Sequence, residues 1–233
     1  LLRRLVQQGV EASSLPIVRF RRESRMPVSY AQRGLWLTWR LAPHSAAYNL
    51  GGALVLNGEL DVRALGKAVD DLARRHEVLS TVFRLTADGE PEQHILPPNI
   101  DILQLEDLSG LPTGEREAQA RERARHHAEQ PFDLEAGPVW RAMLLRLDDR
   151  THWLSIIAHH IAADGWSISV LLEDLAALYE ARAAGVEPAL ALLPIQFSDY
   201  AMWQREWTAA GEMDRQLGYW QRQLGTDHPV LPL

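Results

Sequence analysis

The sequence predicts an α/β fold, a layered α+β sandwich in which helices pack against a mixed sheet. Strand-like and helix-like segments are mixed along the chain, and this order of elements is typical of layered domains. The chain has 233 residues, of which 46% are hydrophobic and 24% are charged. It is therefore long enough for one large globular domain, or two small ones, with a sizeable core.

Apolar runs that are bounded by turn residues predict the strands. The predicted strands cover residues 48–56, 78–85, 93–96, 100–105, 139–147 and 152–158. Turn signals close three of them, at Asn57-Gly58, Asp88-Gly89 and Asp148-Asp149. The last two turns join neighbouring strands, so each indicates a hairpin.

Apolar residues at helical spacing predict the helices, which cover residues 30–41, 62–75, 113–130, 166–184, 197–207 and 212–224. Asp61 is a good N-cap for the second of these helices. The helix over residues 113–130 is highly charged with a thin apolar stripe, so we expect it on the surface. His126 and His127 are then expected on its solvated side.

The tryptophans and the aromatic residues of the region 197–207 are interpreted as packing residues. Tyr200, Trp203 and Trp207 recur at helical spacing, which favours a packed helix face over a surface that stacks on substrate. The same interpretation applies to Trp36, Trp39, Trp140 and Trp220.

Net charge and residue content exclude several classes of function. The charge is 24 − 31 = −7, which argues against a nucleic-acid partner, because phosphate binding needs clustered Lys and Arg. The chain has no cysteine, so it has neither a disulfide nor a thiol nucleophile. No apolar run approaches the ~18 residues that would span a membrane, and no secretory signal begins the chain. We therefore expect a cytoplasmic protein with no membrane partner.

The most informative segment runs from Ile156 to Trp166, with the sequence IIAHHIAADGW. Its apolar, β-branched start predicts a buried strand, and Gly165 indicates a turn or a close backbone approach. His160 therefore lies where a buried strand opens into a loop, with the carboxylate of Asp164 four residues later. This arrangement suits an imidazole that takes up a proton, although a purely structural histidine also fits it.

A metal site is not expected at this histidine pair. Adjacent residues of a strand point to opposite faces, so His159 and His160 cannot easily bind one ion together. The chain also lacks the cysteines that would complete a soft site. The same alternation separates the faces of the two side chains.

The segment HHIAADG resembles the HHxxxDG signature of the condensation domains of nonribosomal peptide synthetases, which belong to the chloramphenicol acetyltransferase-like superfamily. Three more segments resemble further motifs of that family, and they occur in the family's order. They are SYAQRGLW at residues 29–36, RHEVLSTVF at 75–83 and DYAMWQ at 199–204. The resemblance extends from about Met26 to the C-terminus.

The resemblance implies a chloramphenicol acetyltransferase-like lobe, one half of a V-shaped domain with two lobes. Residues 27–233 would form the N-terminal lobe, and the C-terminal lobe would be absent. Residues 1–26 would be a linker from a preceding carrier domain. That segment contains a basic run, which we interpret as solvated linker rather than as a patch for an anionic partner: Arg19, Arg21, Arg22 and Arg25.

The activity that the resemblance implies is acyl transfer, in which an amine attacks a carrier-bound thioester and forms a peptide bond. His160 is the catalytic position, and His159, Asp164, Gly165 and Trp166 support it. An imidazole has an ordinary pKa of about 6.5, which suits a base at neutral pH. His160 would act as that base, or it would position the amine or stabilise the tetrahedral intermediate.

The implied partners are the upstream and downstream peptidyl carrier proteins, the missing C-terminal lobe and the adjacent adenylation domain. No cofactor or metal is expected to bind directly. The substrates would arrive on the 4′-phosphopantetheine arms of the carriers. With half of the channel absent, the isolated lobe is expected to fold but to be inactive or nearly so.

Asp164 has two interpretations. It could orient His160 as in a triad, or it could anchor the loop through a salt bridge to an arginine, which is the role that the resemblance favours. The family usually has that arginine where this chain has Ser80, and a second arginine where it has Gly34. Arg74 or Arg75 could substitute for the first.

Two other functions stay open. One is an epimerisation or dual epimerisation/condensation domain, although residues 1–48 lack the additional His-rich motif of the dual type, and Trp166-Ser167 resembles the condensing type. The other is a non-catalytic lobe that only docks a carrier protein. The intact HHxxxDG motif argues against this docking role.

Overall fold

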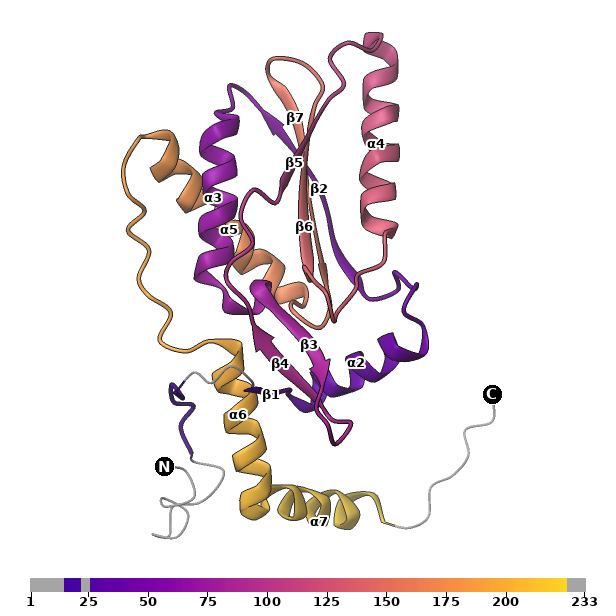
Figure 1. The fold of residues 1–233 in the computed structure, drawn as a ribbon, viewed down its shortest axis with the longest axis vertical. Coiled ribbons are helices and arrows are strands. Elements are labelled where there is room, and N and C mark those ends of the chain that lie inside the picture. Colours follow the sequence, from indigo (N-terminus) through magenta and orange to yellow (C-terminus); the bar gives the residue numbers. More distant parts are fainter. Residues whose placement is uncertain (1–14, 22–25, 226–233) are drawn as a thin grey trace.

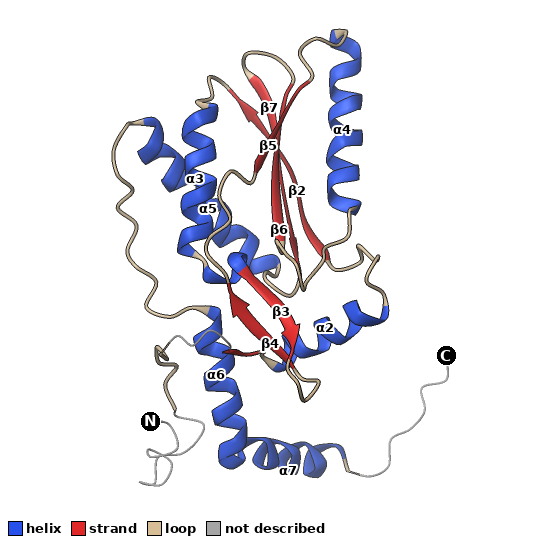
Figure 2. Cartoon of the chain, in the orientation of Figure 1, coloured by secondary structure: helices blue, strands red, loops and turns tan. Residues whose placement is uncertain are grey.

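The computed structural model describes residues 15–21 and 26–225. They form two sheets with helices packed around them, which confirms the predicted α/β fold with a mixed sheet (Figures 1 and 2). The strands are β1 (Met26–Pro27), β2 (Asn49–Asn57), β3 (Thr81–Leu85), β4 (Pro91–Ile95), β5 (Leu103–Asp107), β6 (Trp140–Arg146) and β7 (Thr151–His159). The α-helices are α2 (Tyr30–Leu41), α3 (Val62–Arg75), α4 (Thr113–Glu129), α5 (Gly165–Ala183), α6 (Phe197–Trp207) and α7 (Met213–Leu224).

The larger sheet has the strand order β2-β7-β6-β5. Strands β2, β7 and β6 pair antiparallel, whereas β5 runs parallel to β6, so the sheet is mixed. In Figure 1, α3 and α5 cover one face of this sheet and α4 lies along the other. The central strand β7 ends at His159, which places the histidine pair at one end of the sheet.

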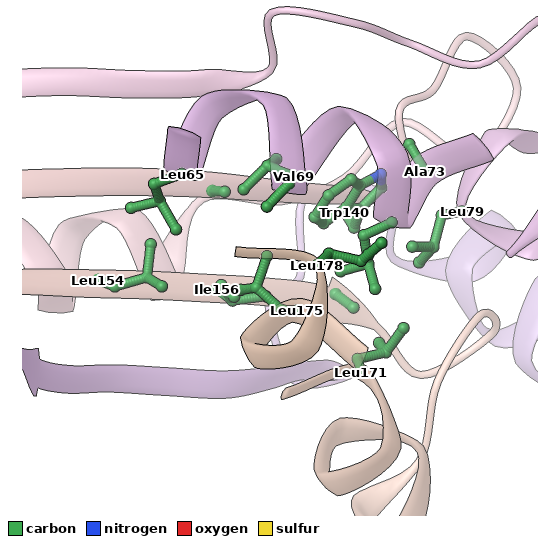
Figure 3. Packing of buried hydrophobic residues seen from close by; sticks show 14 of the residues in the cluster. Leu65, Val69, Ala73, Leu79, Trp140, Leu154, Ile156, Leu171, Leu175 and Leu178 are labelled. Atoms are coloured by element: carbon green, nitrogen blue, oxygen red, sulfur yellow. The ribbon is translucent and has the colours of Figure 1, made fainter. Parts of the chain in front are cut away.

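Alternation along β6 and β7 divides the core between the two faces of the sheet. Ala142 and Leu144 of β6 join Leu154 and Ile156 of β7 in the cluster under α3 and α5. Figure 3 shows Leu154 and Ile156 in this cluster. Met143 and Leu145 point the other way, into a smaller cluster beneath α4 that contains Ala120. This period of two is the reason why both strands are continuous apolar runs: both of their faces are buried.

The smaller sheet has the order β1-β4-β3, and all of its pairs are antiparallel. The predicted strand over residues 78–85 begins late, because a short 3₁₀-helix, η2 (Glu77–Ser80), precedes β3. The predicted strand over residues 100–105 is likewise displaced and lies at 103–107. In both cases the apolar stretch extends beyond the residues that pair with a neighbouring strand.

The start of α3 agrees with the predicted cap, and α2 begins with a cap that was not predicted. The side chain of Asp61 accepts a hydrogen bond from the amide of Ala64 at the start of α3. Ser29 and Gln32 form a capping box at the start of α2. Helices α6 and α7 are separated by a π-type turn, Thr208–Glu212, in which Gly211 has a φ of 97°. Glycine suits this kink because it adopts positive φ at little cost.

Two predictions about exposure are wrong, namely that His127 is solvated and that Trp220 is packed. His127 is buried, because α4 lies on the sheet and turns this residue toward Ser155, whose Oγ is 2.9 Å from His127 Nδ1. Trp220 is 55% exposed, because α7 has no buried residue and extends away from the larger sheet (Figure 1). Trp36, Trp39 and Trp140 are buried as predicted.

The aromatic face of α6 packs against the N-terminal segment. Trp203 stacks on Trp207 with ring centroids 5.3 Å apart, and its Nε1 donates to the carbonyl of Leu15. The amide of Phe20 donates to Asp199 Oδ1. Residues 15–21 of the proposed linker therefore lie against α6, with Arg19 and Arg21 exposed. Arg22 and Arg25, with the rest of residues 1–14 and 22–25, lie outside the described residues.

Candidate functional site

The two histidines at the end of β7 differ in exposure. The amide of His159 donates to the carbonyl of Val139, at 2.8 Å, and the amide of His160 donates to the carbonyl of Tyr48, also at 2.8 Å. The two neighbouring chain segments thus hold the backbone of the pair. His159 is only 3% exposed, whereas His160 is partly exposed. Of the two imidazoles, His160 is the one that solvent reaches.

His159 is a packed, neutral residue. Its Nδ1 accepts a hydrogen bond from the amide of Ile161 at 3.1 Å, and its ring lies edge-on to Phe132 with centroids 6.2 Å apart. Burial, followed by the charge of His160, lowers the pKa of His159 to about 4. At neutral pH this imidazole is therefore uncharged, which suits its supporting position behind His160.

Asp164 is the N-cap of α5. Its Oδ1 accepts from the amide of Ser167 at 2.7 Å and from the hydroxyl of Ser167 at 2.5 Å. These two bonds, with a smaller contribution from the charge of His160, hold the pKa of Asp164 below its ordinary value. No hydrogen bond between described residues joins Asp164 to His160. The carboxylate therefore fixes the loop at the helix end and does not orient the imidazole directly.

Neither Arg74 nor Arg75 replaces the family's anchoring arginine. Arg74 pairs with Asp71 and Arg75 pairs with Asp174, each at 2.8 Å. Within the described part of the chain no arginine forms a salt bridge to Asp164. The physical reason is local: Ser167 already satisfies the exposed carboxylate as a helix cap.

The two positions where the family has arginine differ in their surroundings. Ser80 is 8% exposed, and its buried Oγ has no hydrogen-bond partner among the described residues. It lines a groove of about 400 Å³ that also contains Asn99 and Pro138. Gly34 is exposed on α2, where an added Cβ would meet nothing within 4 Å. Ser80 thus lines a groove, whereas Gly34 lies on the surface.

Gly165 and Trp166 face open space. Gly165 begins α5, and an added Cβ there would meet nothing within 4 Å, so the described chain does not itself require glycine. Trp166 is 82% exposed. It borders a groove of about 330 Å³ whose lining includes Ala162 of the histidine loop, as well as Phe197 and Tyr200 of α6. Trp166 therefore lies exposed at a groove beside the histidine loop.

The sequence interpretation missed three residues that hold the site. Gln32 donates a hydrogen bond to the carbonyl of Ile161, and the carbonyl of Tyr48 accepts one from the amide of His160. Gly51 allows β2 to lie close to β7. A signal was present for two of them. Ser29 and Gln32 stand at capping-box spacing, and glycine inside a strand often marks a close backbone approach.

No group of His, Asp or Glu side chains in residues 15–21 and 26–225 is arranged to hold a metal ion. A search of the same residues finds no helix that is both long enough and apolar enough to cross a membrane. The site at the end of β7 therefore consists of one partly exposed imidazole, its buried neighbour, and a capped loop.

The sequence matches the family described as "Condensation domain" over residues 22–233. Among curated proteins it is 43% identical to chondramide synthase cmdD of Chondromyces crocatus, over 88% of this chain and 5% of that protein. It is 40% identical to phosphinothricin tripeptide synthetase PhsC of Streptomyces viridochromogenes, over 89% of this chain and 19% of that protein. This chain thus spans a small part of these relatives.

Among solved structures, the chain resembles the X-domain from teicoplanin biosynthesis in its complex with OxyB. The TM-score is 0.78 and the identity is 35%, over 94% of this chain and 48% of that one. The first condensation domain of the calcium-dependent antibiotic synthetase shares the fold, with a TM-score of 0.75 at 24% identity over 87% of this chain and 48% of that one. The chain spans about half the length of both. It belongs to the condensation-domain family of nonribosomal peptide synthetases.

Proposed function

We propose that this chain supplies the catalytic histidine, His160, for peptide-bond formation between two carrier-bound substrates. The observation that carries the proposal is the contrast within the pair: His160 is partly exposed at the end of β7, while His159 is buried and neutral. A catalytic imidazole must reach a substrate and also be held in place. Of the two, only His160 meets both conditions.

In the proposed reaction, the amine of an aminoacyl group attacks the carbonyl carbon of an acyl or peptidyl thioester. A C–N bond forms and the C–S bond breaks. The nitrogen loses one proton and the departing sulfur gains one, so the products are an amide and a thiol. His160 transfers this proton, or it positions the amine and stabilises the tetrahedral intermediate through a hydrogen bond.

The surroundings of the loop support access for long substrate arms. The space in front of Gly165 is open, and Trp166 stands exposed beside a groove. We infer that 4′-phosphopantetheine arms of the upstream and downstream carrier proteins deliver the substrates to this side, and that no cofactor binds to the chain itself. The remaining partners are a second lobe and the adjacent adenylation domain of the same synthetase.

The test is a single-turnover assay on a synthetase segment that contains the complete condensation domain and both loaded carriers. His160→Ala should reduce the rate of dipeptide formation by about 100-fold or more, since a positioned general base contributes 10²–10⁴-fold. The matched control is His126→Ala, which removes an exposed histidine of α4 and should leave the rate unchanged. Melting temperatures of both variants check the fold.

A second variant separates the two roles of His160. His160→Gln keeps a hydrogen-bonding side chain but cannot take up a proton. If His160 is a base, the glutamine variant should be as slow as the alanine variant, and the pH dependence of the rate should lose its acid limb. A partly active glutamine variant would instead assign the histidine to positioning.

A recruitment function is the second candidate, and one comparison favours it. The related X-domain, at 35% identity, was solved as a complex with OxyB, so a domain similar to this chain binds a partner protein. If this chain serves only to dock a carrier, His160→Ala should leave product formation and carrier binding unchanged. That result would overturn the catalytic assignment.

A further inference from the structure

We propose that Gln32 is a positioning residue for His160, acting through the carbonyl of Ile161. This inference rests on the proposed function of His160. Gln32 lies on α2, 129 positions before Ile161, and its Nε2 donates to the Ile161 carbonyl at 3.2 Å. Ile161 follows His160 directly, so this bond connects helix α2 to the catalytic loop.

The glutamine itself is held at every polar atom. Its Oε1 accepts from the amide of Ser29 at 3.0 Å, and its Nε2 also lies 3.4 Å from Oε1 of Gln93. Gln93 on β4 in turn donates to the carbonyl of Pro27 at 2.7 Å. Both glutamines are 1% exposed. A buried amide whose hydrogen bonds are all made has a fixed orientation, so it can hold a loop in one position.

The other backbone hydrogen bonds of residues 160–162 reach the end of β7, the segment before β2 and the loop itself. The amide of Ile161 donates to His159 Nδ1, the amide of Ala162 donates to the His159 carbonyl, and the amide of His160 donates to Tyr48. The bond from Gln32 differs, because it reaches the loop from a separate helix. It fixes the peptide that follows Ile161 relative to α2 and the smaller sheet.

The apolar surroundings strengthen this role. The side chain of Ile161 packs in a buried cluster with Val28, Trp36 and Phe83, which belongs to the same part of the fold as Gln32. Water does not reach the carbonyl freely there, so losing the amide donor leaves an unsatisfied buried acceptor. The loop can satisfy that acceptor only by moving, and such a movement displaces His160 relative to its substrates.

The experiment uses the complete condensation domain with both loaded carriers, and it compares Gln32→Leu and Gln32→Glu with wild type in single turnover. Leucine has no donor, and an ionised glutamate only accepts hydrogen bonds. Both variants should lower the rate constant for product formation by about 10- to 100-fold, as expected for a small misplacement of a catalytic group. The substrate concentration at half-maximal rate should change little.

Gln204→Leu is the matched control. Gln204 also bonds to the backbone of α2, since its Oε1 accepts from the amide of Tyr30 at 2.9 Å, but its other side-chain hydrogen bond goes to Tyr200 and not to the histidine loop. A merely structural role for Gln32 would give both leucine variants a lower melting temperature with a normal rate. The proposal expects slow turnover in Gln32→Leu alone, measured well below the melting temperature.

A pH series provides a readout that does not depend on whether Gln32→Leu folds. A protonated glutamate regains an O–H donor, so the rate of Gln32→Glu relative to wild type should rise as the pH falls. A ratio that stays constant with pH, together with an unperturbed rate in either variant, would overturn the proposal.

Combined variants separate this inference from the proposed function. If Gln32 acts through His160, the double variant Gln32→Leu/His160→Ala should be no slower than His160→Ala alone. Multiplicative losses would mean that Gln32 acts elsewhere. If His160→Ala is fully active, the proposed function itself fails, and this result is distinct from a normal rate in Gln32→Leu beside an inactive His160→Ala.

Discussion

At the scale of single residues, Asp164 has a different role from either of the two that the sequence suggested. The carboxylate caps α5 through Ser167, and within the described residues it forms no salt bridge to an arginine and no hydrogen bond to His160. It acts on the site by fixing the loop that leads from His160 into the helix. A local helix cap of this kind could have been anticipated, because aspartate followed by a helical pattern is a common start signal.

This role predicts different outcomes for two substitutions. Asp164→Asn should keep most of the activity, because asparagine is as good an N-cap as aspartate, whereas Asp164→Ala should lose about 1 kcal/mol of unfolding free energy. Denaturant titration and single-turnover assays of the complete domain measure both. In a Ser-His-Asp triad, the corresponding change to asparagine costs about 10⁴-fold in rate. A loss of that size in Asp164→Asn would contradict the capping role.

Sequence reasoning at this scale succeeded for the histidine pair. The resemblance implied a packed His159 and an accessible His160, and the structure has His159 buried and His160 partly exposed. Sequence reasoning failed for His127, because the charged sequence of α4 does not indicate which of its turns packs on the sheet. Burial and the nearby Arg141 lower the pKa of His127 to about 4, so it is a neutral buried residue and not a solvated one.

At the scale of elements, β2 links the sheet to the site. It pairs with β7 along its whole length, and the carbonyl of Tyr48, just before β2, anchors His160. The close approach depends on Gly51, which lies opposite Ile157 with a φ of 127°. An added Cβ would stand 2.0 Å from the carbonyl oxygen of Ile156. No side chain fits there unless the strands separate.

Alanine substitutions at the adjacent Gly51 and Gly52 should therefore have opposite effects on stability. Gly51→Ala should destabilise the fold by about 1–3 kcal/mol through backbone strain alone, and the clash with β7 should add to this loss. Gly52→Ala is the matched control: its Cβ would meet nothing within 4 Å, so alanine should be neutral or stabilise the strand by up to about 1 kcal/mol. Denaturant unfolding of the two variants tests this, and equal stabilities would refute the steric argument.

Helices were predicted better than strands, for a physical reason. Caps and apolar spacing are local signals, so the start of α3 at Val62 and that of α4 at Thr113 were found from sequence. The start of β3 at Thr81 and the position of β5 depend on which partner strand is available. The 3₁₀-helix before β3 and the parallel pairing of β5 with β6 are tertiary outcomes that a local pattern does not contain.

At the scale of the whole molecule, the fold class followed from the order of elements, but the division into two sheets did not. Register between distant strands, such as β1 with β4, is fixed by packing that a single sequence does not display. The same limit applies to α7. Its pattern predicted a helix, and the structure shows large apolar side chains left exposed along it: Met213, Leu217, Tyr219, Trp220 and Leu224.

The exposed residues of α7, together with Trp166 beside the site, form apolar surface that no described residue covers. An exposed apolar surface of this kind marks an interaction site, and the chain spans about half the length of its solved relatives. We infer that a second lobe completes the channel and holds both substrates against His160. The isolated chain should therefore fold but form dipeptide at least about 100-fold more slowly than the complete domain, because catalysis by positioning needs both walls.

The comparison uses the same loaded carriers with the isolated chain and with the complete domain, and circular dichroism checks that the isolated chain is folded. His160→Ala in the complete domain sets the baseline rate. The rate of the isolated chain should lie near this baseline, because no substrate is held in line with its imidazole. Product formation by the isolated chain at a rate comparable to that of the complete domain would show that this lobe alone positions both substrates, and the inferred role of the second lobe would be wrong.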